Sequence, residues 1–224
     1  MKFSTILVDL DRTIFDFDQA EESALIATFE KFNIPFSQDA LRLYRHNNER
    51  HWQLYEQGKI NMHQVDVGRF VDTLQQLDVV RDVDAVSDFF QHQLDFGYQL
   101  CPNAGEVLEQ LSAKCKLYAI TNGAIRTQKQ RLRGTGLDKL FSGVFISDEI
   151  GYSKPQKQFF DYALGMLEEK DVTKILLIGD SLRIDIEGGK QVGVKTCWYN
   201  PTGRSVTHDA DFEIANLLQL IDIV

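Results

Sequence analysis

The sequence has few cysteines, and they are scattered. Only three of the 224 residues are cysteine, Cys101, Cys115 and Cys197, and none belongs to a Cys-x-x-Cys pair. An odd set with such wide spacing is typical of free thiols in a reducing compartment rather than of a disulfide framework. The sequence therefore gives no indication of a secreted, disulfide-stapled domain.

Long hydrophobic runs are also missing. The start of the chain, MKFSTILVDLD, has one lysine and an apolar stretch too short for a signal peptide, and no later run has the length of a membrane span. Internal repeats, low-complexity segments and Pro/Gly-rich linkers are absent as well. We therefore expect a cytoplasmic protein without a membrane partner.

Positive charge is in deficit. The formal net charge is -9, with 33 acidic against 24 basic residues. A surface that neutralises a phosphate backbone needs the opposite balance, so nucleic acid is not an expected partner. A small phosphorylated substrate stays open, because a metal ion and one lysine reverse the local field.

Apolar runs rich in Leu or β-branched residues predict buried strands. They lie at 5–8, 117–120, 144–146 and 175–178, with a weaker fifth run at 194–199. Continuous rather than alternating runs favour strands covered on both faces, as in parallel sheets. Helical patterns at 102–113, 125–133, 157–167 and 184–191 lie between them. This alternation predicts an α/β fold with a doubly wound, Rossmann-like parallel sheet.

A long insert separates the first two predicted strands. From about residue 18 to residue 98 only helical periodicity is present, with Ser37 as a candidate helix cap and Asn61 with Gln64 as a candidate capping box. We expect residues 18–98 to form a helical cap domain. Residues 1–17 and 99–224 would then form the catalytic core.

Polar side chains follow four of the predicted strands. Because parallel strands end at the same edge of a sheet, these side chains are expected to meet there. They are Asp9, Asp11, Thr121, Asn122, Lys154, Asp180 and Asp185.

Such a set suits phosphoryl transfer. Oxygen ligands without histidine or thiolate favour Mg²⁺ over zinc, and a cation would offset the repulsion among Asp9, Asp11 and Asp180. Asp9 is a candidate nucleophile, and Asp11 a candidate general acid and base. The Thr121 hydroxyl and the Asn122 backbone N–H are candidates to hold phosphate oxygens. Lys154 would neutralise both phosphate and nucleophile.

Four stretches in order, DLDRT, ITN, SKP and GDSLRID, resemble the four motifs of the haloacid dehalogenase (HAD) superfamily. The resemblance implies Mg²⁺-dependent phosphatase chemistry with Asp9 as nucleophile and Asp11 as acid/base. It also implies a metal held by Asp9, the Asp11 carbonyl and Asp180, with Asp185 in support. The insert is similar to a C1-type cap. TIFDF, SDEIGYSKP, GDSLRIDIEGG and WYNPTG resemble a subgroup of nucleoside 5′-monophosphatases.

Some residues allow two interpretations. Arg12 stands where the family usually has Asp or Gly, and its side chain points either away from the metal or into the site. Asp185 either supports the metal or favours a helix N-terminus. Six cap residues are candidates for a base pocket, although helical spacing favours core packing for each of them: Arg45, His46, His51, Trp52, Tyr55 and Arg69. His208 is expected to face solvent.

The expected activity is hydrolysis of a small phosphomonoester, with a nucleoside 5′-monophosphate as the preferred candidate. Other small-molecule phosphatases and a phosphoglucomutase remain alternatives, since a mutase shares the same aspartates. A 2-haloacid dehalogenase is disfavoured because it has no use for Asp11 and Asp180. A regulatory module without turnover is the alternative from another class, with Arg12 as its one supporting feature.

Overall fold

The apolar runs form one parallel sheet in the computed structural model, which describes residues 2–224. The order of the strands across the sheet is β3-β2-β1-β4-β5-β6, and every neighbouring pair is parallel. This confirms the predicted doubly wound α/β fold. The strands are β1 (Thr5–Asp9), β2 (Lys116–Thr121), β3 (Gly143–Ile146), β4 (Ile175–Gly179), β5 (Lys195–Tyr199) and β6 (Phe212–Ile214).

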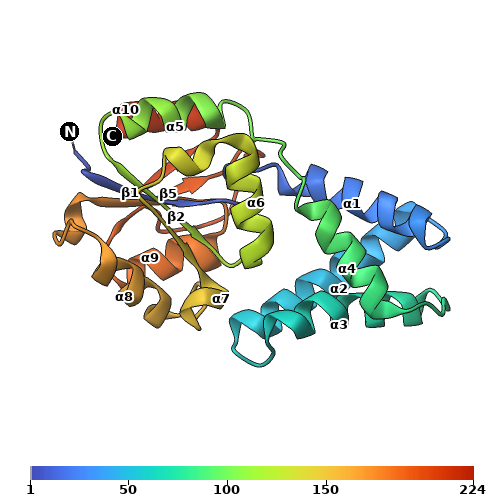
Figure 1. The fold of residues 1–224 in the computed structure, drawn as a ribbon. Coiled ribbons are helices and arrows are strands. Elements are labelled where there is room, and N and C mark those ends of the chain that lie inside the picture. The colour runs from blue at the N-terminus through green and yellow to red at the C-terminus, as the bar shows by residue number, and fades with distance from the viewer. Residues whose placement is uncertain (1) are drawn as a thin grey trace.

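Helices cover both faces of this sheet, as Figure 1 shows. One face packs against α5 (Ala104–Ser112), α6 (Ile125–Thr135) and α10 (Leu220–Ile223). The other packs against α8 (Lys157–Met166), with α9 (Glu187–Gln191) and the short α7 (Ser147–Ile150) nearby. With cover on both faces, all five residues of β1 and of β4 are buried, which explains the apolar runs at 6–8 and 175–178 within them.

Two details of the core differ from the sequence prediction. Strand β6 was not predicted, because it has only three residues and just one of them is buried. The helix expected at 184–191 is divided into a π-helix at Leu182–Ile186 followed by α9. Short 3₁₀ turns complete the described elements at Leu137–Lys139, Val172–Lys174 and Leu217–Gln219.

The insert between β1 and β2 is a bundle of four helices that lies beside the carboxyl ends of the central strands (Figure 1). They are α1 (Phe17–Lys31), α2 (Gln38–Glu56), α3 (Met62–Gln76) and α4 (Val83–Leu94). Ser37 caps α2, and Asn61 forms the predicted capping box with Gln64 at the start of α3. The bundle has its own hydrophobic core, built around Leu25, Phe29, Tyr44, Phe70 and Phe90.

Two linkers join the bundle to the sheet, residues 10–16 on the way out and residues 95–103 on the way back. They run side by side. The Asp16 N–H donates to the Gln99 carbonyl at 2.9 Å, and the Cys101 N–H donates to the Ile14 carbonyl at 2.8 Å. Because only these paired segments connect the two parts covalently, they are the natural place for a hinge.

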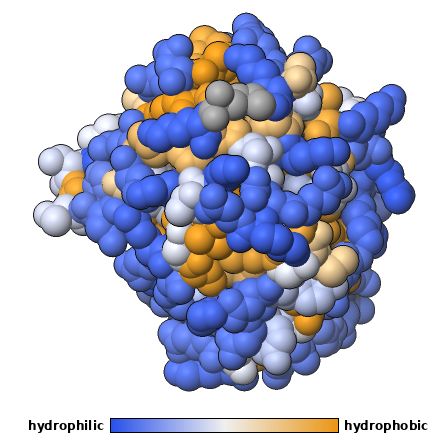
Figure 2. Space-filling view, turned by 90° about the vertical axis from the view of Figure 1, so that its left-hand side faces the viewer, coloured by the Kyte–Doolittle hydropathy of each residue, from blue (hydrophilic) through white to orange (hydrophobic). Residues whose placement is uncertain are grey.

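Two further observations concern the surface and the helices. Figure 2 looks onto the end of the core away from the bundle and shows a mainly hydrophilic surface with smaller hydrophobic areas. Within residues 2–224, every helix is too short or too polar to cross a membrane.

Candidate active site

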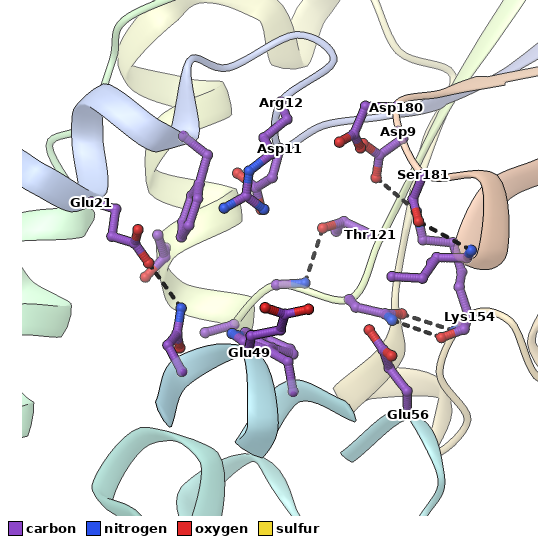
Figure 3. Close-up of a pocket in the computed structure, with 18 of the residues that line it drawn as sticks. Asp9, Asp11, Arg12, Glu21, Glu49, Glu56, Thr121, Lys154, Asp180 and Ser181 are labelled. Atoms are coloured by element: carbon purple, nitrogen blue, oxygen red, sulfur yellow. Dashed lines mark hydrogen bonds and ion pairs between the residues drawn. The ribbon is translucent and has the colours of Figure 1, made fainter. Parts of the chain in front are cut away.

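Three carboxylates meet where the strand order reverses beside β1. Asp9 ends β1, Asp180 follows β4, and Asp185 lies in the π-helix after it. Each offers one oxygen, and these oxygens all lie within 4.8 Å of one another. This switch point is where ligands bind in doubly wound sheets. In Figure 3, Asp9 and Asp180 lie side by side on the core side of the cavity.

Local features of the chain explain why Asp185 reaches the cluster. A Cβ atom on Gly179 would lie 2.3 Å from the Asp185 carboxylate, so only glycine leaves space for it there. The Ser181 N–H donates to the Asp185 carboxylate at 3.2 Å. The wide π-helical turn is a feature found frequently at functional sites, and here it carries the third carboxylate. The structure therefore places Asp185 inside the cluster.

Lys154 is the buried counter-charge of this cluster. Its ammonium donates to Asp9 Oδ1 at 2.7 Å and to Asp185 Oδ1 at 2.7 Å. Its side chain is only 2% exposed. Burial alone would lower the pKa of Lys154, but Asp185 and Asp9 raise it above its ordinary value, so the ammonium stays charged.

One ammonium does not neutralise three carboxylates. Burial raises the pKa of Asp9 well above its ordinary value, and Asp185 and Asp180 raise it further against the opposing effect of Lys154. Burial, with the neighbouring Asp185 charge, raises the pKa of Asp180 to about 7. The cluster thus has an excess of negative charge that a divalent cation would offset. Converging carboxylate oxygens are the donor set that Mg²⁺ prefers, so the residues present fit this ion.

Thr121 and Asn122 lie at the end of β2, next to Lys154. The Thr121 hydroxyl accepts a hydrogen bond from the Gly123 N–H at 3.0 Å. The Asn122 side chain makes two bonds of 2.8 Å to the backbone of Lys154, one to its N–H and one to its carbonyl. Besides the backbone role expected from the sequence, Asn122 therefore holds the lysine loop in place.

The Asp11 carboxylate is not part of the carboxylate cluster. Its side chain lines the same cavity, but its two oxygens accept hydrogen bonds from Gln128 and Arg131 on α6. Neither of these α6 residues was singled out from the sequence. They are more than 115 positions away from Asp11 in the chain, and no short motif contains them.

Arg12 points into the site. It adopts a left-handed backbone conformation with φ of 63°, and its side chain lines the cavity. Its guanidinium pairs with Asp18 at 2.7 Å and lies over the Phe17 ring at 4.9 Å. Of the two directions considered from the sequence, the structure thus shows the inward one, with the charge held by the start of α1.

The site opens into a cavity of about 670 Å³ between the sheet edge and the helical bundle. This size is within the range of small-molecule sites. Figure 3 shows Glu49 and Glu56 of α2 on the side opposite the core carboxylates. Residues that were not predicted from the sequence line the side of the cavity formed by the helical bundle: Glu21, Asn48, Glu49, Gln53, Glu56, Asp66 and Gln91.

The six candidate cap residues divide into two groups. Arg45, Trp52 and Arg69 line the cavity, so core packing alone does not describe them. The other three, His46, His51 and Tyr55, are not among its lining residues. The expectation for His208 was wrong: its side chain is 19% exposed and packs edge-on against Trp198, with 4.8 Å between the ring centroids.

The chain is similar to several known proteins. Residues 3–193 match the family described as haloacid dehalogenase-like hydrolase. The chain is 36% identical over 200 residues to the HAD-hydrolase YfnB of Bacillus subtilis, covering 89% of this chain and 85% of that protein. It superimposes on the magnesium-bound crystal structure of YfnB with a TM-score of 0.95 at 34% identity, over 100% of this chain and 99% of that one.

The names of two further relatives state the class of substrate on which they act. The pyrimidine 5′-nucleotidase YjjG of Escherichia coli is 32% identical, over 89% of this chain and 87% of its own length. The pyrimidine 5′-nucleotidase PynA of Streptococcus pneumoniae is also 32% identical, over 90% of this chain and 85% of its own. Both alignments extend across the core and the helical insert.

Proposed function

The chain belongs to the haloacid dehalogenase-like hydrolase family, and from this premise we propose that it is a Mg²⁺-dependent phosphatase of nucleoside 5′-monophosphates. The observation that carries the proposal is the contact of Lys154 with Asp9 inside a buried carboxylate cluster, at the floor of a cavity. A carboxylate at such a place can attack phosphorus, because the lysine and a cation offset the charge of the incoming phosphate.

In the proposed reaction, Asp9 attacks phosphorus and the bond from phosphorus to the ester oxygen breaks. Asp11 gives its proton to the departing oxygen, which leaves as an alcohol. Asp11 then takes a proton from water as that water attacks phosphorus and the bond to Asp9 breaks. Inorganic phosphate leaves, and both aspartates return to their starting states.

The other residues of the site hold the phosphate. The Thr121 hydroxyl and the Asn122 N–H provide donors to its oxygens, and Lys154 offsets its charge. Asp9, the Asp11 carbonyl and Asp180 would hold Mg²⁺, with Asp185 beside them. The bound ion would supply charge neutralisation at the phosphoryl group.

The nucleotide as substrate is supported by the cap wall of the cavity. Trp52 offers an aromatic surface, and Arg45 offers a planar, partly exposed guanidinium group, and nucleobases stack on both kinds of group. The two nucleotidase relatives align over this part of the chain as well as the core. We propose that residues 18–98 act as a cap domain that closes over the nucleotide and excludes water.

A panel of nucleotides and sugar phosphates, with released inorganic phosphate as the readout, tests the substrate. We expect the highest kcat/KM with a pyrimidine nucleoside 5′-monophosphate, and no release in the presence of EDTA. Asp9→Asn should abolish turnover with an unchanged circular dichroism spectrum, while Asp161→Asn on the exposed face of α8 should be fully active. Substantial turnover by Asp9→Asn would remove Asp9 as the nucleophile, and isomerisation without phosphate release would indicate a mutase.

A further inference from the structure

The carboxylate of Asp11 is held at both oxygens by one helix. Arg131 Nη1 donates to Asp11 Oδ1 at 2.5 Å, and Gln128 Nε2 donates to Asp11 Oδ2 at 2.5 Å. Both donors are on α6, three residues apart, so they lie on the same face of the helix. A carboxylate with a donor on each oxygen cannot rotate freely, and its direction is set by α6.

Arg131 also contacts both linkers of the hinge. Its Nε donates to the Gly97 carbonyl at 2.9 Å, on the returning linker. Its guanidinium carbon lies 4.1 Å from the centroid of the Phe15 ring, on the outgoing linker. The side chain of Arg131 is 1% exposed. One buried guanidinium therefore joins Asp11 to the two segments about which the cap would move.

Helix α6 is fixed to the returning linker at a second point. Asp95 accepts a hydrogen bond from the Thr127 hydroxyl at 2.7 Å and pairs with Arg126 at 2.8 Å. Space for the Gln128 contact depends on Gly123, since a Cβ atom there would lie 2.1 Å from Gln128 Nε2. The sequence between β2 and α6 thus allows the amide to reach Asp11.

We propose that Arg131, assisted by Gln128, is a positioning residue that orients the Asp11 carboxylate for proton transfer. Through its contacts with both linkers, Arg131 also couples this orientation to the conformation of the hinge. The inference rests on the proposed function, because it takes Asp11 as the acid that protonates the leaving oxygen. In this proposal Arg131 acts through its contact with Asp11. Its loss should affect the reaction only where a proton from Asp11 matters.

The choice of leaving group distinguishes a loss of proton transfer from Asp11 from a general loss of activity. An alcohol leaving from an alkyl phosphate or a nucleoside monophosphate needs a proton as the ester bond breaks, whereas p-nitrophenolate leaves without one. The ratio of kcat/KM for the two substrates reports only steps up to the loss of the leaving group, so later hydrolysis of the phosphorylated Asp9 does not enter it. A general fault in folding or phosphate binding would lower both values together.

We therefore expect Arg131→Lys to lower kcat/KM about 10- to 100-fold for the best nucleotide of the panel, because well-placed acid catalysis contributes of order 10²–10⁴. The value for p-nitrophenyl phosphate should change less than about 3-fold, as expected when no proton is needed. Gln128→Leu should shift the ratio in the same direction and serves as the second variant if Arg131→Lys folds poorly. Arg133→Lys, at an exposed arginine on the same helix, is the matched control and should leave the ratio unchanged.

A double variant that combines Arg131→Lys with Asp11→Asn tests whether Arg131 acts through Asp11. If Arg131 acts through Asp11, adding Arg131→Lys to Asp11→Asn should produce no further change in the ratio. An unchanged ratio in both the Arg131 and Gln128 variants, or an equal loss for the two substrates, would overturn the inference while leaving the phosphatase proposal intact. If the wild-type protein releases no phosphate from any ester with Mg²⁺, the proposed function fails, and the inference fails with it.

Discussion

The hydroxyl of Tyr55 on the cap helix α2 lies 2.9 Å from the hydroxyl of Ser147 on the core. Two further contacts join the same end of α2 to the core: Glu56 pairs with Arg183 of the π-helix, and Gln156 Nε2 donates to the Glu56 carbonyl at 3.2 Å. These links lie across the cavity from the hinge. They connect the free end of the cap to the loops that carry the carboxylates and Lys154.

Removing one of these links should weaken substrate retention without harming the chemistry. One neutral hydrogen bond contributes about 1 kcal/mol, so Tyr55→Phe is expected to raise KM by up to about 5-fold with little change in kcat. Steady-state kinetics with the best nucleotide measures this. Tyr162→Phe, at a half-exposed tyrosine on α8, is the control and should have wild-type KM. A fall in kcat at constant KM in Tyr55→Phe would contradict a role of the Tyr55–Ser147 contact in substrate retention.

Metal binding should depend on Asp180 in a way that can be seen without turnover. Asp180 contributes one of three converging oxygens, so Asp180→Asn should greatly reduce or abolish the rise in Tm that excess Mg²⁺ gives the wild-type protein. Differential scanning calorimetry with Mg²⁺ and with EDTA provides the readout. The variant without metal should be no less stable than the wild type, because it removes a carboxylate from a negatively charged cluster. An equal Mg²⁺-dependent rise in both proteins would exclude Asp180 as a ligand.

A separate pH effect is expected at Asp211, far from the metal cluster. Burial alone would raise the pKa of Asp211, but hydrogen bonds from Lys195 and Thr196 lower it to about 2. A carboxyl with a lowered folded-state pKa stabilises the fold above its ordinary pKa of 3.8, and this stabilisation is lost as the pH falls from there toward 2. After allowance for solvent screening, we expect Asp211→Asn to lose about 1 kcal/mol at pH 7.

Urea unfolding at pH 7 and at two values below pH 4 measures this difference. The free energy of unfolding of wild type and variant should converge as the pH falls, because protonation removes the same interactions from the wild type. Asp209→Asn, at an exposed aspartate two residues away, should match the wild type throughout. A difference that is constant with pH would show that packing, and not the charge of Asp211, is responsible.

Much of the architecture was accessible from the sequence because its signals are local. Four of the six strands contain a continuous apolar run and β5 contains a weaker one, and such runs follow from cover on both faces of a parallel sheet. The caps at Ser37 and Asn61 are equally local, since each side chain bonds to the backbone three residues on. Strand β6 was missed because three residues with one buried side chain carry too little pattern to distinguish a strand from a loop.

The sequence predicted the residues at the floor of the cavity but only a few of those on its walls. Asp9 and Thr121 end β1 and β2, and Asp180 directly follows β4, so the strand positions bring these three residues to one edge. Lys154 lies further along the chain, after β3 and α7, and was predicted from the polar segment that follows β3. The Arg131 contact with Asp11 spans 120 positions and depends on the packing angle of α6, which no periodicity encodes.

Helical spacing in the cap does not show which side chains face the cavity. The cap helices have two buried surfaces, one toward the bundle core and one toward the cavity, and spacing alone does not separate them. Tyr44 lies in the bundle core, whereas Trp52, two turns further along α2, lines the cavity. Only the assembled fold distinguishes these two aromatic side chains.

A substitution of Trp52 tests whether the cap recognises the base of the nucleotide. Stacking of a base on an aromatic ring contributes about 1–3 kcal/mol, so Trp52→Ala should raise KM for the best nucleotide by about 10-fold or more. The same variant should keep wild-type KM for ribose 5-phosphate if the panel shows that this sugar phosphate is hydrolysed, because it has no base to stack. His46→Ala, on the same helix but outside the cavity lining, is the matched control. Equal losses for nucleotide and sugar phosphate would mean that Trp52 serves cap packing, and that the base is recognised elsewhere in the cavity or is not recognised at all.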